Sequence, residues 1–482
     1  MKTKKFLGIS VILLVLLLAF PGVPVYGEES TEPGTPFYSE YSGKPDTSWF
    51  TESFEGYDAD TATFTLTSAD QFMGLSAICT AENEFLSDYT VRLAADIRLN
   101  KGNVQDWING DAPANTYLPI TEFRGVFDGD GHVISGIYYY NGNAANFGMF
   151  CTLNGATVKN VAVVNSLIVG SQQLGIICGR IKGEASTVSN VYSDATIYGL
   201  KHHVGGLIGC LETGDGNHIG QTVIESCAFA GEVVAFEGQY AGGMISNTNG
   251  HEVTVRNCIN LGSISATTQR VGGIIGTSWC TDTTVTTVLE YCINAGPVSS
   301  AKSIGAITGY HKQNPLTISN YVMVSDFATT EVGEILGNIT PNLTGGETKT
   351  AEQIKGTAVF DHWVAVENGY PMPSVTVASM IEKVQLLATV STPDPDEEDS
   401  SSSDSAEDSE ETENPGNASQ QTTAETDEVT SPVQNVGSPS DTGIETEPKQ
   451  TGGCASSVTV GFPTLLTLAT MVVFVKKARK ER

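Results

Sequence analysis

Short apolar segments broken by glycine recur through the middle of the chain. A hexapeptide in which glycine follows an apolar residue appears six times, at intervals of 27, 30, 37, 30 and 33 residues. Its copies start at Phe147, Leu174, Val204, Ala241, Val271 and Ile304. A second apolar piece follows each copy, as at residues 158–161 and 255–259. Alternating apolar positions bounded by Gly, Asn and Ser predict short strands joined by turns.

The regular repeat also predicts how these strands pack. A strand this short is not stable alone, but stacked repeats pair each strand with its copies above and below and bury one continuous apolar column. We therefore predict an all-β fold, a parallel β-solenoid.

Two helix signals flank the repeats. Ser68-Ala69-Asp70-Gln71 is a capping box, and the apolar residues after it have helical spacing, which predicts a helix over 69–83 that covers the N-terminal end. Thr350-Ala351-Glu352-Gln353 repeats the box, and Phe360, Trp363 and Tyr370 are expected to plug the C-terminal end. Solenoid ends need such caps because they expose unpaired strand edges.

The first 27 residues predict a secretory signal peptide. Lysines at positions 2, 4 and 5 precede an apolar run over 6–20, and small residues stand before Gly27, where we expect cleavage. An uncleaved N-terminal anchor is the alternative, although the run is short for a membrane span.

The last 32 residues, 451–482, predict a membrane anchor or sorting signal. An apolar stretch over 458–475 is followed by a basic tail, the pattern of one span with its positive end inside. The arrangement resembles sorting signals of Gram-positive surface proteins, so the stretch is either kept or cut away. Gly453 and Cys454 stand where the sorting motif would be, as candidates for processing or attachment.

A strongly acidic segment lies between repeats and anchor. Residues 391–450 contain 17 Asp and Glu, one Lys and no aromatic residue. Such a segment is expected to be disordered, because it has too little apolar surface to offset its ordering entropy. The resulting organisation is a signal peptide (1–27), an N-terminal extension (28–62), the repeats (63–375), a short segment (376–390), the linker (391–450) and the anchor (451–482).

Charge limits the partners. The chain has 25 Lys and Arg against 55 Asp and Glu, a net charge of −30. A nucleic-acid partner is not expected, since phosphate binding requires a basic face. The expected partners are the membrane, through the C-terminal helix, and an extracellular glycan or protein.

The repeats resemble a known motif. Val204-Gly205-Gly206-Leu207-Ile208-Gly209 and Val271-Gly272-Gly273-Ile274-Ile275-Gly276 are similar to the GLUG motif of bacterial surface proteins. Residues 123–135 also match the opening coil of such domains, and the resemblance covers about 63–373. It implies a right-handed parallel β-helix displayed outside the cell, often in adhesin-like or peptidase-linked proteins. It implies no single activity.

Nine cysteines in a secreted chain first suggest disulfides. However, Cys227, Cys258 and Cys292 share one register of successive repeats, which favours a ladder of buried thiols. No C-x-x-C pair is present, so structural zinc is not expected.

No cofactor or metal is expected. His251 is followed by Glu252 but lacks the second histidine of the H-E-x-x-H pattern. Asp128-Gly129-Asp130-Gly131 offers oxygens to calcium, but the spacing does not complete an EF-hand and a tight turn explains it.

These observations favour a non-enzymatic adhesin-like, binding or spacer module at the cell surface, with a polysaccharide-cleaving β-helix enzyme as the alternative. Such enzymes place carboxylates together on one face. Here only Glu225 and Glu290 share a register, with Arg256 between them. The candidate ligand-binding residues are aromatic and polar side chains expected on loops. They are His202, His203, Asp215, Asn217, Phe236, Tyr240, Trp279 and Tyr310.

Overall fold

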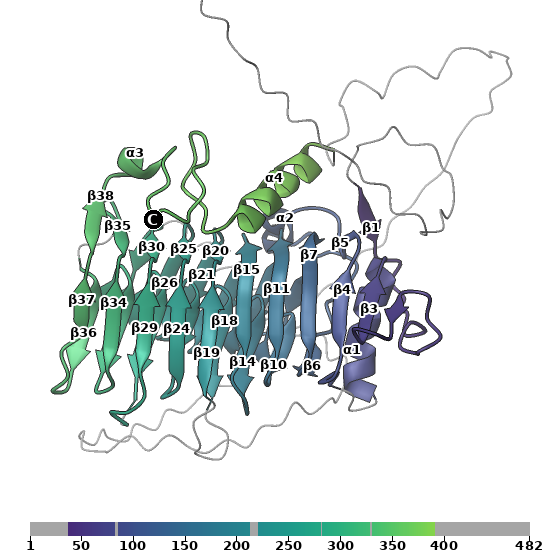
Figure 1. Cartoon of the computed structure of the whole chain (residues 1–482), viewed down its shortest axis with the longest axis horizontal. Helices are drawn as coiled ribbons and strands as arrows, with labels where there is room; N and C mark the ends of the chain where they lie inside the picture. The colour runs from purple at the N-terminus through teal and green to yellow at the C-terminus, as the bar shows by residue number, and fades with distance from the viewer. Residues whose placement is uncertain (1–36, 82–84, 213–219, 281, 328–329, 391–482) are drawn as a thin grey trace, which may run out of the picture.

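The computed structural model is a β-solenoid and describes residues 37–81, 85–212, 220–280, 282–327 and 330–390 (Figure 1). Corresponding strands of successive repeats pair in parallel, as predicted. The predicted signal peptide, acidic linker and C-terminal span lie outside the described residues. Within the described ranges, no helix is both long and apolar enough to cross a membrane.

Each rung of the solenoid passes through four sheets. Sheet B has eight strands. They are β6 (Ile120–Phe123), β10 (Phe150–Leu153), β14 (Cys178–Lys182), β18 (Ile208–Glu212), β23 (Ile245–Asn247), β28 (Ile275–Trp279), β33 (Thr308–Lys312) and β36 (Val332–Leu336). Sheet C contains β8 (Tyr138–Tyr140), β12 (Leu167–Gly170), β16 (Thr196–Gly199), β21 (Glu232–Ala235), β26 (Ser263–Ala266) and β31 (Val298–Ser299). Sheet D contains β9 (Ala145–Phe147), β13 (Gln172–Leu174), β17 (Val204–Gly205), β22 (Ala241–Gly242), β27 (Gln269–Gly272) and β32 (Lys302–Gly305).

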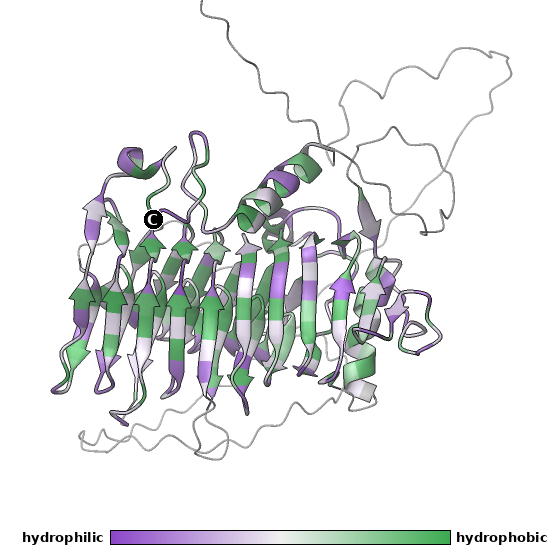
Figure 2. Ribbon diagram, viewed as in Figure 1, coloured by the Kyte–Doolittle hydropathy of each residue, from purple (hydrophilic) through white to green (hydrophobic). Residues whose placement is uncertain are grey.

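Sheet A, in front in Figure 1, is the widest. Its lower row contains β2 (Tyr57–Asp58), β3 (Thr63–Leu66), β4 (Thr90–Leu93), β7 (Val126–Ser135), β11 (Thr157–Val164), β15 (Thr187–Ser193), β19 (Gln221–Glu225), β24 (Glu252–Arg256), β29 (Thr287–Glu290), β34 (Leu316–Ser319) and β37 (Asn342–Thr344). Its upper row adds β1 (Tyr38–Glu40), β5 (Asp96–Arg98), β20 (Ala228–Phe229), β25 (Ile259–Asn260), β30 (Ile293–Asn294), β35 (Val322–Val324) and β38 (Glu347–Lys349). Figure 2 shows hydrophobic and hydrophilic stretches alternating along these strands.

Each hexapeptide forms the corner between sheet D and sheet B. A Cβ on Gly205 would lie 1.9 Å from the carbonyl oxygen of Ile208, and one on Gly206 would lie 2.2 Å from that of Gly243. Glycine is therefore required because neighbouring backbones approach closely at this corner.

The second glycine position of the hexapeptide is matched in size by a residue of sheet A in the same rung. Gly206 faces Phe229, and Gly273 faces Asn294; an added Cβ would lie 2.7 Å and 2.3 Å from the respective Cγ atoms. Where this position is Ile176, the register partner of Phe229 in sheet A is the small Ser193. The departure at Ile176 is thus matched by a smaller residue across the core.

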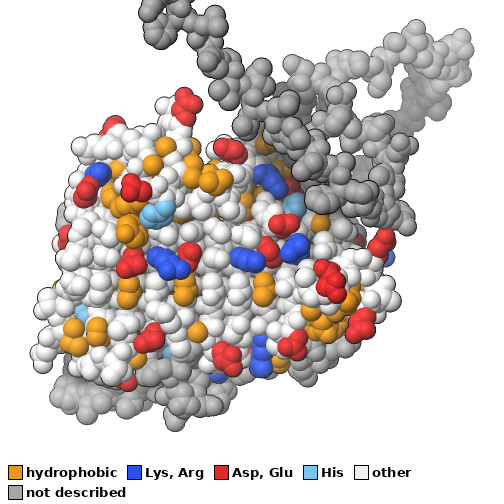
Figure 3. Space-filling view, in the orientation of Figure 1, with side chains coloured by type: hydrophobic (Ala, Val, Ile, Leu, Met, Phe, Trp, Pro, Cys, Tyr) orange, Lys and Arg blue, Asp and Glu red, His pale blue; other side chains and the backbone are white. Residues whose placement is uncertain are grey.

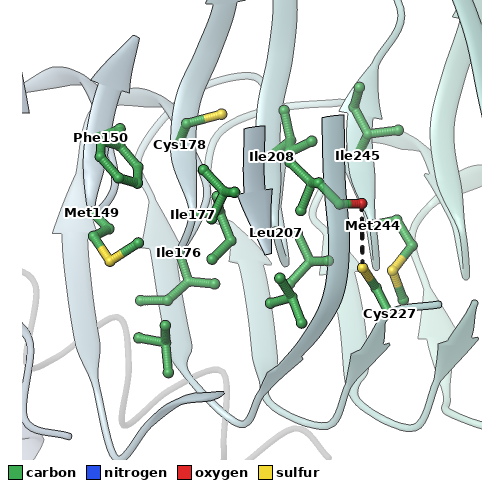
Figure 4. Close-up of a cluster of buried hydrophobic side chains, with 14 of the residues drawn as sticks. Met149, Phe150, Ile176, Ile177, Cys178, Leu207, Ile208, Cys227, Met244 and Ile245 are labelled. Carbon is green, nitrogen blue, oxygen red and sulfur yellow. Dashed lines mark hydrogen bonds between the residues drawn. The ribbon is translucent and has the colours of Figure 1, made fainter. Parts of the chain in front are cut away.

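The core changes character along the solenoid. In the earlier rungs aligned apolar side chains fill it, as Figure 4 shows for Met149, Phe150, Ile176, Ile177, Leu207 and Ile208. In later rungs buried polar side chains take up several of these positions. They are Thr248, Asn260, Ser278, Thr287, Asn294, Thr308, His311 and Asn314, each at most 1% exposed.

The N-terminal end is capped. The predicted helix is α1 (Ala69–Ala81), and Ser68 Oγ accepts from the backbone N–H of Gln71. Residues 37–62, placed in a separate extension by the sequence analysis, add β1 and β2 to sheet A. They also bury Trp49, whose ring lies 5.3 Å from that of Phe64. On the side of sheet C, α2 (Val104–Asn109) packs Trp107 against Tyr138.

The expected plug at the C-terminal end is wrong. After α3 (Ala351–Ile354) the chain turns back, and Trp363 packs on the outer face of upper sheet A with residues such as Ile293. The final helix, α4 (Val375–Val390), then runs over β15, β11 and β7 (Figure 1). This return path covers apolar side chains on the outer face of sheet A. It does not cover the last rung, where Ile335, Leu336 and Leu343 remain partly exposed.

Cys227, Cys258 and Cys292 are buried free thiols in successive rungs, as the predicted ladder requires. Cys227 and Cys258 each donate to a backbone carbonyl of their own turn, at 3.2 Å. Burial raises the pKa of the Cys292 thiol to about 12.

Candidate functional site

A column of side chains follows the start of sheet D, with one residue from each rung. It is formed by the residue before each hexapeptide, and we call it the corner ladder. Its members are Asn146, Gln173, His203, Tyr240, Arg270 and Ser303. All have positive φ, from 55° at Gln173 to 69° at Tyr240. This left-handed backbone is uncommon outside glycine, so the bend in each rung is made here and repeated in register.

The centre of the corner ladder is a stack of rings and a cation. The His203 and Tyr240 rings are 4.8 Å apart and nearly parallel, at 10°. The Arg270 guanidinium carbon lies 4.9 Å from the Tyr240 ring centroid and 4.2 Å from that of Tyr310. Arg270 also donates a hydrogen bond to the Tyr240 hydroxyl. Cation–π and ring stacking thus fix the planes of these groups.

Amides hold the ladder on both sides. Gln173 Nε2 donates to Cys210 Sγ at 3.3 Å, and Asn247 Nδ2 lies 3.4 Å from His203 Nδ1. On the outer side, Gln269 Nε2 donates to Gln239 Oε1 at 2.6 Å. The ladder is therefore a preformed surface rather than a set of loose side chains.

His203 is neutral in this setting. Burial, and to a lesser degree the neighbouring His202, lowers the pKa of His203 to about 3. A neutral imidazole can stack on Tyr240 without repelling Arg270 two rungs below.

Four predicted site residues lie at this corner. His202, His203 and Tyr240 are partly buried neighbours, and Tyr310 lies beneath Arg270. The expectation of exposed loop aromatics is wrong for Tyr310, which belongs to β33 and is 3% exposed.

The other predicted residues are elsewhere. Trp279 ends β28 on the outside of sheet B, with Lys312 Nζ 5.4 Å from its ring centroid. Phe236 packs against Tyr198 in the cluster outside sheet C, at 5.4 Å, so it does not join the corner ladder. Asp215, Asn217, Gly453 and Cys454 lie outside the described residues.

Arg270, Gln173 and Asn247 were not among the predicted site residues. Arg270 and Gln173 have the same position in their repeats as His203 and Tyr240, directly before the hexapeptide. Aligning the repeats on that position would have found them, because one position per rung forms one column.

The opposite face carries paired charges. In sheet A, Glu225, Arg256 and Glu290 are in register, as predicted, and Arg256 bonds Glu225. Lys159 Nζ lies 3.2 Å from an Asp128 carboxylate oxygen. Figure 3 shows this row of basic and acidic side chains across the front of the molecule. Lys159 and Arg256 are thus each neutralised by a neighbouring carboxylate.

The described residues contain no group of three or more His, Cys, Asp or Glu side chains placed to hold a metal ion. Asp128, the first residue of the predicted turn, lies within β7, where it accepts from Asn160 Nδ2 and the backbone N–H of Asp130. Its oxygens are thus already used by protein donors.

Comparisons with known proteins give local similarity. The sequence matches no protein-family model. Over 122 residues, 25% of this chain, it is 36% identical to halomucin of Haloquadratum walsbyi, and the match spans about 1% of that much longer protein. Among solved structures, it resembles a putative immunoglobulin A1 protease from Bacteroides ovatus, with a TM-score of 0.43 and 20% identity over 64% of this chain and 91% of the other.

Proposed function

We propose that this chain is a non-enzymatic binding module of the cell exterior, in which the corner ladder binds an extended glycan. The observation that carries the proposal is the column from Gln173 to Arg270, which presents amide, imidazole, phenol and guanidinium groups in consecutive rungs. Aligned strands repeat at about 4.8 Å, so the ladder offers a periodic set of contacts to a periodic polymer.

The chemistry of the ladder suits sugars. Amides and guanidinium groups hydrogen-bond hydroxyl and carboxylate oxygens, and aromatic rings provide flat apolar contact area. The ladder residues are held by stacking and hydrogen bonds before any ligand arrives, which lowers the ordering cost of binding.

The exterior location rests on the sequence. The predicted signal peptide over 1–27, the acidic linker over 391–450 and the anchor over 451–482 together describe a folded head tethered to a bacterial cell surface, in keeping with the resemblance to the GLUG motif. Detection of the intact chain on unpermeabilised cells by antibody labelling tests this part; a purely intracellular signal contradicts it.

A glycan array with the purified chain tests the ligand class. We expect binding to at least one extended polysaccharide, and about tenfold weaker binding after Tyr240→Gln, since one well-placed aromatic contact contributes on the order of 1 kcal/mol. Gln173 has the same backbone position, so glutamine is compatible with the bend. Phe236→Gln, in the cluster outside sheet C, is the control. No binding on the array, or equal loss in the control, contradicts the proposal.

The non-enzymatic role is supported by the separation of Glu225 and Glu290 by an ion-paired arginine. Retaining and inverting glycosidases need two carboxylates facing one bond. Incubation with each bound polysaccharide, followed by a reducing-end assay, is expected to show no cleavage. Release of oligosaccharides that is lost in Glu225→Gln would instead establish the polysaccharide-cleaving alternative.

A further inference from the structure

The surface formed by sheets D and B has the opposite charge to the protein as a whole. Five consecutive rungs cross it, at 172–182, 202–212, 239–249, 269–279 and 302–312. We call these segments the D–B surface. They contain five cations, namely Arg180, Lys182, Arg270, Lys302 and Lys312. They contain one acid, Glu212, so the net charge of these five segments is 5 − 1 = +4, within a chain of −30. The adjoining strand of sheet B, β36, adds Glu334, which accepts a hydrogen bond from Ser303 and is the register partner of Tyr310.

Within the described part of the chain, the cations of the last two of these rungs have no carboxylate partner. Glu212 pairs with Arg180, and residues 269–279 and 302–312 contain no Asp or Glu. Among the described residues, no carboxylate lies within ion-pair distance of Arg270, Lys302 or Lys312. In sheet A, by contrast, Lys159 and Arg256 are both paired. Arg270, Lys302 and Lys312 are thus available to pair with an external anion.

Aromatic rings position two of these cations. Arg270 lies between the Tyr240 and Tyr310 rings, and Lys312 lies over Trp279. In sheet D, Lys302 is the register partner of Gln269, the residue before Arg270, and it is exposed. A planar guanidinium held in this way can bind a carboxylate or sulfate with two parallel hydrogen bonds.

From this geometry we infer that the D–B surface binds negatively charged polysaccharides, through Arg270, Lys302 and Lys312. The inference rests on the proposed function and adds the charge of the ligand. Arg270 lies in one rung and Lys302 and Lys312 lie in the next, so an extended polyanion that crosses both rungs can meet all three charges. The positive surface on an acidic protein also attracts such a ligand selectively to this face.

Matched polymers test the inference. The full-length chain, purified in detergent, is titrated with polygalacturonate and its methyl ester, and with dextran sulfate and dextran. We expect at least about tenfold tighter binding to one charged polymer than to its neutral partner at low salt. The preference should fall as the ionic strength rises from about 0.05 to 0.5 M, because exposed charges are screened. The two pairs distinguish carboxylate from sulfate recognition.

Substitutions test whether Arg270 is responsible for the preference for charged polymers. Arg270→Gln has the precedent of Gln173 at the same backbone position, and it is expected to reduce the preference for the charged polymer about tenfold. Arg270→Lys keeps the charge but loses the planar guanidinium, so its preference for the charged polymer should lie between those of the unchanged protein and Arg270→Gln. Lys101→Gln makes the same charge change at an exposed residue beside α2 and should leave binding unchanged.

The outcomes separate the two proposals. If neutral and charged polymers bind equally, or if Lys101→Gln matches Arg270→Gln, the inference on charge is wrong and the glycan-binding function stands. If duplex DNA binds as tightly as the charged polysaccharides, the surface is a non-specific polyanion binder and the inference is wrong. If none of these polymers binds and the glycan array is also blank, the proposed function fails as well.

Discussion

The earlier and later rungs of the solenoid share one backbone but are filled differently. One inward column of sheet B reads Ile120, Phe150, Cys178 and Ile208 in the earlier rungs and Ile245, Ile275 and Thr308 in the later ones. The neighbouring column changes from Leu153, Ile181 and Leu211 to Thr248, Ser278 and His311. Strand pairing therefore maintains the fold even where the side chains inside are polar.

Hydrogen bonds compensate part of this burial. Asn260 Nδ2 donates to Asn294 Oδ1 at 2.8 Å, so the two asparagines connect adjacent rungs. Asn314 Nδ2 donates to Thr287 Oγ1 at 3.1 Å, and that oxygen is 3.1 Å from Ser278 Oγ. Satisfied polar groups cost little to bury, whereas unsatisfied ones cost about 1–3 kcal/mol each. The earlier rungs should accordingly contribute more of the stability.

The largest expected effect is a cavity in the earlier rungs. Phe150 is fully buried, with Phe123 and Phe127 at ring distances of 4.9 and 5.8 Å. Phe150→Ala should lower the free energy of unfolding by about 3–5 kcal/mol. The matched change in the later rungs is Thr308→Ala in the same column, which should cost less than about 1 kcal/mol, since its buried hydroxyl has no hydrogen-bond partner among the described groups. Urea denaturation compares the two; similar losses would contradict the contrast.

The second-largest expected effect is a loss of stability of the later rungs at acidic pH. Burial lowers the pKa of His311 to about 4, from 6.5. Between these values the unfolded chain binds a proton that the folded chain does not, so the free energy of unfolding falls by about 3 kcal/mol as the pH falls from 6.5 to 4. His311→Leu should flatten this pH dependence, with Leu211 as the precedent in that column. The pKa of His203 is also lowered, so His203 would add to the same pH dependence. The protein with His311 and the His311→Leu variant are therefore both compared in a His203→Gln background. An unchanged pH dependence would show that His311 is not responsible.

Disturbing the size match between Gly273 and Asn294 should lower the stability by a smaller amount. Gly273→Ala introduces a Cβ 2.3 Å from Asn294 Cγ and is expected to cost about 1–3 kcal/mol. Asn294→Ser, for which the pair of Ile176 and Ser193 is the natural precedent, should recover part of that loss. A double-mutant cycle by thermal unfolding measures the coupling, and a coupling of zero would mean that the two positions are independent.

Ser278→Ala should have the smallest effect. It removes one partner of Thr287 and of the more distant Asn314 Nδ2, which is 3.4 Å from Ser278 Oγ. We expect a loss of about 1 kcal/mol in urea denaturation. A gain in stability would show that the polar network of the later rungs is not stabilising.

The sequence predicted the solenoid well, because the apolar spacing and the glycine corners are local and repeat. It also predicted the register of Glu225, Arg256 and Glu290, which follows from aligning the repeats. It did not predict where Trp363 would pack, since an apolar side chain fits the end of the solenoid and its outer face equally well. The corner ladder was found only in part. Arg270 reads as an ordinary loop cation until the backbone places it between Tyr240 and Tyr310.

The path of α4 back along sheet A determines where a pulling force on the C-terminal side of the chain would act. Ser374 Oγ bonds Asn190 in β15, and farther along the chain Lys383 Nζ lies 3.3 Å from Asp96 beside β7, so the helix runs toward the first rungs. A pull applied beyond Val390 therefore acts first on α4 and its side-chain contacts, away from the strands at the opposite end. If α4 detaches, the segment over 375–390 becomes slack before any rung must open, while Trp363 still packs on sheet A. The helix is therefore placed to yield first when force passes between the predicted anchor and the proposed binding face.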